Sequence, residues 1–211
     1  MRNTFAKKIT KLAKKNKKIV LLSGDIGNRL FDDFKSKFSN RFYNCGVAET
    51  NMVGVAAGLA SAGFFPFVYT ITPFLISKCF EQIRLDVCYQ KLNVFIVGTG
   101  SGLSYSRLGP THHSLEDIGL MQLIPNMKIC TPSDSIELSK LLPQLIKDKG
   151  PYFLRLGKKG EPNINKLSKK IKLGEPNIIN KGKDILILSL GNILKEANIL
   201  RIKLINNKKN P

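Results

Sequence analysis

The chain has 211 residues, of which 43% are hydrophobic, and carries a formal net charge of +19 at pH 7. This length fits one domain of ordinary size with a short appendage, and the hydrophobic content supports a core, which argues against general disorder. No apolar run reaches the roughly 18 residues that span a bilayer, and Ile19–Leu22 is too short for the core of a signal peptide. We therefore expect a cytoplasmic protein that does not bind a membrane.

The positive charge does not resemble a nucleic-acid interface. Lysines gather in residues 7–18, 158–183 and 203–209, without interleaved aromatic residues and without a nucleic-acid-binding motif. This distribution favours solvated basic surface over nucleic-acid binding. The cysteines show no CxxC or zinc spacing, so we expect free thiols in a reducing compartment and no metal site: Cys45, Cys79, Cys88 and Cys130.

Strand-like and helix-like segments alternate over the first three quarters of the chain. The expected strands are residues 18–23, 41–45, 65–69, 93–97, 128–131 and 152–156, and the expected helices are residues 3–17, 31–38, 47–63, 73–90, 116–123 and 133–148. This alternation predicts an α/β fold, a parallel sheet with helices on both faces. Ligands of such folds bind beyond the carboxyl ends of the strands, where polar residues follow here at Asp25, Glu49, residues 98–113 and residues 155–159.

The composition changes near Gly157, where a basic stretch containing proline and asparagine begins. We expect one domain over residues 1–160 and a linker over 161–183. Asp184–Leu190 (DILILSL) is predicted to be a buried strand and Ile193–Ile205 a helix. One strand and one helix cannot bury a core of their own, so we expect residues 184–211 to be the truncated start of a second α/β domain.

The segment 41–63, RFYNCGVAETNMVGVAAGLASAG, places Glu49 in the first turn of a helix that is small and apolar on nearly every face, and hence buried. A first-turn glutamate commonly complements the helix dipole, and Gly54 and Gly58 are compatible with tight helix packing alone. An acid at the carboxyl edge of a parallel sheet, in apolar surroundings, also indicates a functional carboxyl group.

The string FYNCGVAETNMVGVAAGLA resembles the signature of the pyrimidine-binding domain in transketolase-like thiamine diphosphate enzymes. The resemblance implies that Glu49 hydrogen-bonds N1′ of the cofactor's aminopyrimidine ring and promotes the tautomer whose 4′-nitrogen removes the C2 proton. In YTITPFLISKCFEQIRLD, Phe74 and Phe80 match aromatic residues that wall the ring, while Ser77 replaces a third. Asp25, in SGDIG, matches an aspartate close to the ring.

The resemblance also implies substrate contacts. His112, in GPTHHSLED, matches a histidine that faces the substrate, where an imidazole can hydrogen-bond an oxygen or move a proton. Lys158 and Arg155 match basic residues of the family and favour an anionic substrate. Gly100-Ser101 replaces a His-Asp pair and Leu108 an acidic residue of transketolase itself, which argues against ordinary ketose-phosphate transfer.

No GDG motif followed by asparagine occurs, so we expect diphosphate and Mg²⁺ to be held by a separate diphosphate-binding (N-terminal) subunit. The expected assembly is two-plus-two, with the Gly54 and Gly58 helix at an interface. The leading hypothesis is a split transketolase-like enzyme that transfers a ketol or acyl unit between sugar-type substrates. The alternatives are a deoxyxylulose-phosphate synthase-like protein, a 2-oxoacid dehydrogenase beta-type subunit, an inactive truncated remnant and, least favoured, a nucleic-acid-binding protein.

Overall fold

The computed structural model describes residues 1–27 and 29–207. Within them a single parallel sheet has the strand order β2-β1-β3-β4-β6-β5, which confirms the predicted α/β fold. The strands are β1 (Ile19–Ser23), β2 (Phe42–Asn44), β3 (Phe65–Ile71), β4 (Phe95–Thr99), β5 (Lys128–Cys130) and β6 (Tyr152–Leu156). Because all strands are parallel, the loops that follow them meet at one edge of the sheet.

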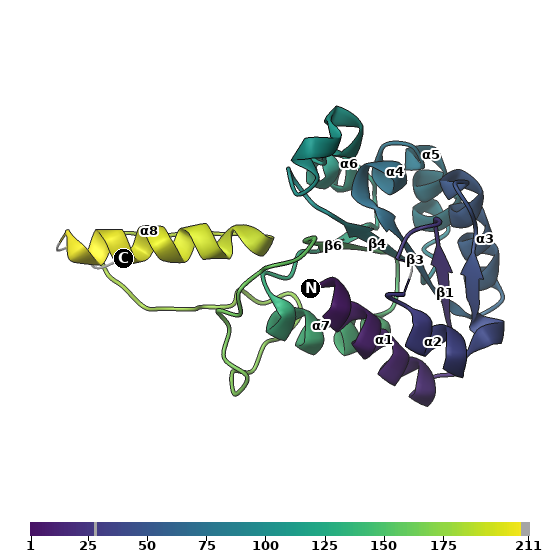
Figure 1. Cartoon of the computed structure of the whole chain (residues 1–211), viewed down its shortest axis with the longest axis horizontal. Helices are drawn as coiled ribbons and strands as arrows, with labels where there is room; N and C mark the ends of the chain where they lie inside the picture. Colours follow the sequence, from purple (N-terminus) through teal and green to yellow (C-terminus); the bar gives the residue numbers. More distant parts are fainter. Residues whose placement is uncertain (28, 208–211) are drawn as a thin grey trace.

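Helices cover both faces of the sheet (Figure 1). One face packs against α1 (Arg2–Lys15), α2 (Asp32–Lys37) and α7 (Ser135–Asp148), in a core rich in aromatic rings. The rings of Phe67 and Phe95 stack there with centroids 4.3 Å apart. The other face packs against α3 (Glu49–Ser61), α4 (Thr72–Ile76), α5 (Phe80–Gln82) and α6 (Asp117–Gln122) through mainly aliphatic side chains.

Two predicted helices differ from the structure. The expected helix 73–90 is divided into α4, a turn at residues 77–79, α5 and a π-helical segment, η2 (Ile83–Tyr89). The helix α3 is buried on one face only, because Val55 is 43% exposed and a Cβ atom added at Gly54 or Gly58 would meet no atom within 4 Å. The expectation of burial on nearly every face was therefore wrong for the chain taken by itself.

Residues 157–190 contain no helix or strand, but their first part is firmly attached to α7. The buried carboxylate of Asp134 caps α7 by accepting hydrogen bonds from the backbone of Ile136 and Glu137. Its other oxygen accepts from the backbone N–H groups of Ile164 and Asn165, at 2.9 and 2.8 Å. The Asp134 side chain thus caps α7 and also holds residues 164 and 165 against this helix.

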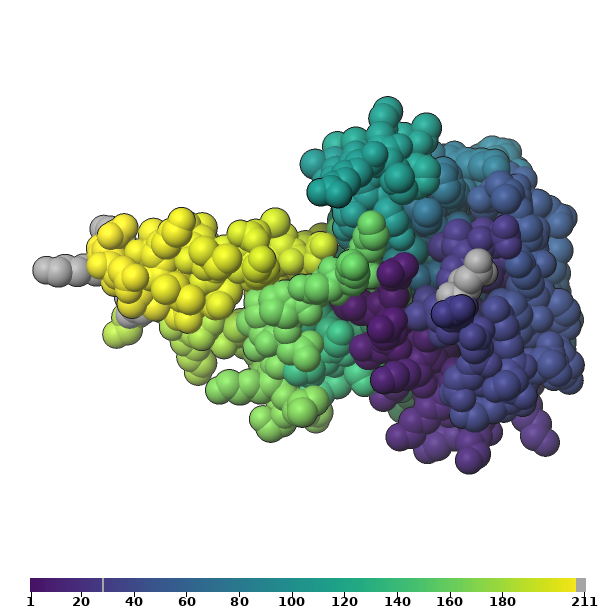
Figure 2. All heavy atoms as spheres, viewed as in Figure 1, coloured from purple at the N-terminus to yellow at the C-terminus, as the bar shows by residue number. Residues whose placement is uncertain are grey.

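The remainder, from Asp184 onward, projects away from the sheet as an arm (Figures 1 and 2). The predicted buried strand Asp184–Leu190 was wrong: it forms no strand, and Leu186 and Leu188 are 81% and 83% exposed. An extended segment becomes a buried strand only beside partner strands, and the sheet of the described residues does not include this segment. The predicted helix follows as α8 (Leu194–Asn206), while residues 208–211 of the expected second domain lie outside the described residues.

Candidate functional site

A hydrogen-bonded network joins the ends of β1 and β2. Asp25, exposed and with a positive φ of 53°, accepts a hydrogen bond from the Asn44 side-chain amide at 2.9 Å. The side-chain oxygen of Asn44 accepts from the backbone N–H of Gly46 at 3.0 Å. The loop that leads to α3 is therefore fixed to the end of the neighbouring strand. Asn44 carries no signal in the sequence, since asparagine before a glycine turn is common.

Glu49 is the first residue of α3, directly at this edge of the sheet. Its side chain is 3% exposed, and its Oε2 atom lies 2.7 Å from the Nζ atom of Lys78, whose side chain is 50% exposed. The ion pair raises the pKa of the Lys78 ammonium, through its hydrogen bond to Glu49 and then through Coulomb attraction. A buried carboxylate thus faces outward to a lysine that itself reaches solvent.

Aromatic rings surround His112 on the neighbouring loop. The imidazole of His112, in the short helical turn η4 (Pro110–His112), meets the ring of Phe74 edge-on, with centroids 5.0 Å apart. The ring of Tyr105 lies 6.1 Å away, and Thr111 Oγ1 is 3.0 Å from Nδ1 of the imidazole. Phe74 and His112, predicted separately, are therefore brought together by α4 and the loop.

A glycine makes this loop conformation possible. Gly100, directly after β4, has a φ of +81°, and a Cβ atom there would lie 2.0 Å from the ring of Tyr105. The Nζ atom of Lys158 lies 4.1 Å from the centroid of that ring, a cation–π contact. The ring of Tyr105 thus contacts the backbone of Gly100, where a side chain would not fit, and Lys158, which was predicted to bind substrate.

A family model for the transketolase pyrimidine-binding domain matches residues 1–162. The chain belongs to this family. A split-gene transketolase described as an inactive β4 tetramer is 33% identical, with a TM-score of 0.89 over 99% of this chain and 68% of that chain. The resemblance inferred from the segment around Glu49 is confirmed.

Two curated relatives indicate the breadth of the family. The 6-deoxy-6-sulfo-D-fructose transketolase subunit of Clostridium sp. (strain MSTE9) is 34% identical over 198 residues, which are 93% of this chain and 62% of the relative. The 1-deoxy-D-xylulose-5-phosphate synthase of Dictyoglomus turgidum is 39% identical over 174 residues, 80% of this chain and 28% of that protein. The chain therefore spans less than two thirds of these relatives, and their names disagree on the substrate.

Other predicted residues have partners of their own. Arg155 donates from Nε to Oδ2 of Asp117 at 2.7 Å, and the two side chains are 12% and 2% exposed. Phe80 packs against the aliphatic core of the α3 face, and no described ring contact joins it to Phe74 or His112. Asp117 was missed because an acid in the first turn of a helix normally indicates only a favourable dipole interaction.

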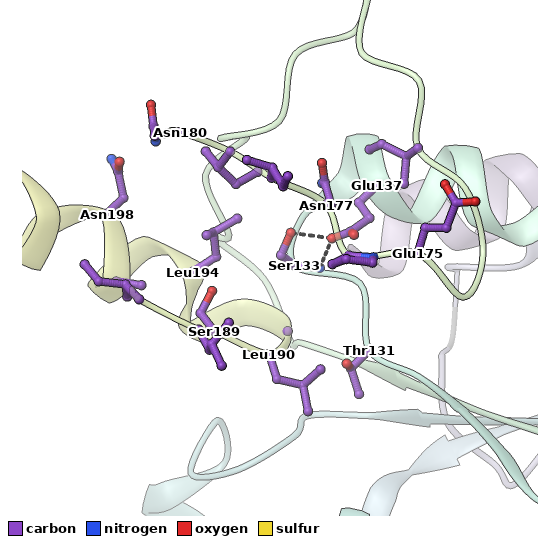
Figure 3. Close-up of a pocket in the computed structure, with 18 of the residues that line it drawn as sticks. Thr131, Ser133, Glu137, Glu175, Asn177, Asn180, Ser189, Leu190, Leu194 and Asn198 are labelled. Carbon is purple, nitrogen blue, oxygen red and sulfur yellow. Dashed lines mark hydrogen bonds between the residues drawn. The ribbon is translucent and has the colours of Figure 1, made fainter. Parts of the chain in front are cut away.

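A cavity of the described chain lies away from this site. It has a volume of about 830 Å³ and is enclosed by the end of β5, α7, the segment after residue 170 and the arm (Figure 3). Glu137 accepts hydrogen bonds from Ser133 in its wall, and no predicted site residue lines it. Within residues 1–27 and 29–207, no group of three His, Cys, Asp or Glu side chains could hold a metal ion, and no helix is long and apolar enough to cross a membrane.

Proposed function

We propose that this chain is the pyrimidine-binding subunit of a split transketolase-like thiamine diphosphate enzyme, which transfers a ketol or acyl unit between sugar-type substrates. The observation that carries the proposal is the buried Glu49 carboxylate, placed by α3 at the carboxyl edge of the sheet with one oxygen facing Lys78. The family match over residues 1–162 and the subunit name of the Clostridium relative support it.

The residues at this edge fit one half of the cofactor. Glu49 offers a carboxyl group for the N1′ position of an aminopyrimidine, and Phe74 offers an aromatic ring beside it. When bound, thiamine diphosphate supplies a C2 carbanion that acts as nucleophile and electron sink. Glu49 holds a proton at N1′, and Asp25 lies at the end of the adjacent strand, fixed by Asn44.

Substrate recognition falls to the loop after β4 and the end of β6. His112 hydrogen-bonds a substrate oxygen, and Lys158 supplies positive charge for an anionic group. Arg155 adds less charge than its sequence position suggests, because the carboxylate of Asp117 already neutralises it.

The second half of the cofactor site belongs to a partner. In the proposal, a diphosphate-binding subunit holds diphosphate and Mg²⁺, two copies of each subunit assemble in the cytoplasm, and the exposed Val55, Gly54 and Gly58 face of α3 lies at an interface. The β4 tetramer named for the split-gene neighbour supports self-association of such chains.

The competing function is that of a deoxyxylulose-phosphate synthase-like protein. It is favoured by the 39% identity to the Dictyoglomus synthase and by the basic Arg155, which by the sequence resemblance matches a basic residue of such synthases. Product analysis with the assembled enzyme separates the two, since only a synthase-like protein forms 1-deoxy-D-xylulose 5-phosphate.

The test is calorimetric titration of thiamine diphosphate and Mg²⁺ into this chain mixed with a candidate diphosphate-binding subunit from a neighbouring gene. We expect binding by the mixture only, and loss of turnover in Glu49→Ala and Glu49→Gln. Glu81→Gln is the matched control, because Glu81 is an exposed carboxylate paired with Arg84 on α5 and the π-helical segment. A mixture of wild-type subunits that binds no cofactor would overturn the proposal.

A further inference from the structure

Among the described residues, the proposed cofactor-activating residue makes one ion pair, which joins a long helix to a short turn. Glu49 begins the thirteen-residue helix α3, whereas Lys78 lies in the turn between α4 and α5. The backbone of residues 77–79 belongs to no helix, and the π-helical segment η2 follows shortly after α5. Interruptions of this kind often occur at functional sites.

The same turn also contacts the substrate loop. Ser77, the neighbour of Lys78, donates a hydrogen bond from Oγ to Oε1 of Glu116 at 3.3 Å, and Glu116 closely follows His112 in the loop. Two adjacent side chains of one turn therefore reach the carboxylate on α3 and the loop that carries the histidine. A movement of this turn affects both halves of the proposed site.

The lysine and the cofactor ring make different hydrogen-bonding demands on the Glu49 carboxylate. The ammonium group of Lys78 is a donor only, so the Glu49 oxygen that it contacts acts as an acceptor. Activation of an aminopyrimidine requires a carboxyl group that shares its proton with the ring nitrogen. An oxygen that carries a proton is a poorer acceptor for an ammonium group, so the lysine and the ring compete for Oε2 of Glu49.

We propose that Lys78 is a latch: it occupies the Glu49 carboxylate in the cofactor-free subunit and is displaced when the aminopyrimidine ring binds. This inference rests on the proposed function and adds a competition within its site. The latch relieves the high cost of leaving a buried carboxylate without a partner. Because the Lys78 side chain is half exposed on a flexible stem, it can turn into solvent without unfolding a helix.

The first test measures the pair in the isolated chain by a double-mutant cycle of thermal unfolding, with Lys78→Met, Glu49→Gln and the double variant. Methionine keeps most of the lysine stem and removes the ammonium group. We expect Lys78→Met to lower the Tm in the wild-type background and to leave it unchanged in the Glu49→Gln background. Equal effects of Lys78→Met in both backgrounds would overturn the pairing.

The second test measures competition, by calorimetric titration of thiamine diphosphate and Mg²⁺ into the mixture with the partner subunit. We expect Lys78→Met to bind the cofactor about three- to tenfold more tightly than the wild type, since the ring no longer displaces a half-exposed ion pair. Lys11→Met, which removes an exposed lysine from α1, is the matched control and leaves the affinity unchanged.

The outcomes separate the two proposals. If the wild-type mixture binds the cofactor and Lys78→Met binds it with equal or lower affinity, the latch is wrong while the proposed function stands. If the wild-type mixture binds no cofactor, the proposed function and the latch both fail, and the stability cycle then identifies the ion pair as a structural contact of α3.

Discussion

The strand β4 and the segment Asp184–Leu190 are both apolar, yet their surroundings are opposite. Every residue of β4 is buried between β3 and β6, whereas Leu186, Leu188 and Leu190 are 55–83% exposed. The difference lies in neighbours and not in composition, because an extended segment buries its side chains only where partner strands and a covering helix exist. An apolar pattern therefore predicts the tendency to form a strand, and the rest of the chain decides its burial.

The segment that precedes the arm shows that a stretch of chain can be held against α7 without forming a helix or a strand. Residues 164–173 form no helix or strand, but side chains of α7 bind their backbone at several points. Asp134 accepts from residues 164 and 165, Lys140 donates to the carbonyl groups of Leu167 and Lys169, and Gln144 bonds residues 171 and 173. This attachment to α7 ends before the arm begins.

The largest expected effect comes from placing the same polar residue in each region. Leu154→Asn, in the buried strand β6, should destabilise the chain by about 4 kcal/mol, because it combines a lost apolar side chain with a buried amide. Leu188→Asn, at a leucine that is 83% exposed, should change the free energy of unfolding by less than about 0.5 kcal/mol. Urea denaturation followed by circular dichroism measures both.

This pair of leucine variants can contradict the comparison directly. If Leu188→Asn destabilised the chain as much as Leu154→Asn, the arm would be part of the cooperative core in solution. Should Leu154→Asn fail to accumulate, Leu154→Ala gives the same ranking with a smaller loss, about 3 kcal/mol.

An intermediate effect is expected at the attachment point. Asp134→Ala removes the cap of α7 and the acceptor for the backbone of residues 164 and 165, and should cost about 2–4 kcal/mol. Limited proteolysis should then cut near residue 165 in the variant and not in the wild type. An unchanged cleavage pattern would show that Lys140 and Gln144 hold the segment without Asp134.

The same carboxylate predicts a dependence of stability on pH. Burial raises the pKa of Asp134, but hydrogen bonds from Glu137, Asn165 and Ile164 outweigh it and lower the pKa below its ordinary 3.8. A carboxyl group with a lowered pKa in the folded state stabilises the fold above its unfolded pKa and loses this contribution as the pH falls through the folded value. Asp134→Asn should therefore flatten the decline of stability below about pH 4.

The smallest effect is expected from removal of residues 184–211. Because most of the leucine and isoleucine side chains of the arm are exposed, the free energy of unfolding of residues 1–183 should change by less than about 1 kcal/mol. Differential scanning calorimetry of the shortened and full chains measures this change. A loss of several kcal/mol would mean that the cavity walls between the arm and α7 contribute to the core.

Much of the sheet was predictable, because its signals are local. The four inner strands, β1, β3, β4 and β6, are largely buried and mostly apolar. All six strands were predicted within two residues of their observed ends, with β6 matched at both. The segment 77–79 was not predictable from periodicity, since apolar residues continue through it at helical spacing although the structure has a turn there.

The candidate site was predictable in part for the same reason. Glu49, Phe74 and His112 follow strands or lie in recognisable motifs, and the structure places Phe74 against His112. Their partners come from distant segments: Lys78 reaches Glu49, and Asp117 reaches Arg155 across 38 positions of the chain. Which lysine or aspartate makes such a contact depends on tertiary packing, which no local pattern contains.

The position of β6 has a consequence for synthesis on the ribosome. This strand is the last of the sheet to be made, yet it lies inside the sheet, between β4 and β5. The helix α1 precedes every strand and packs against α7 as well as against β1 and β3, so the burial of its apolar face is completed only when that later helix emerges. Lysines separate the apolar residues along α1. Their charge should reduce aggregation of the nascent chain until α7 has been synthesised.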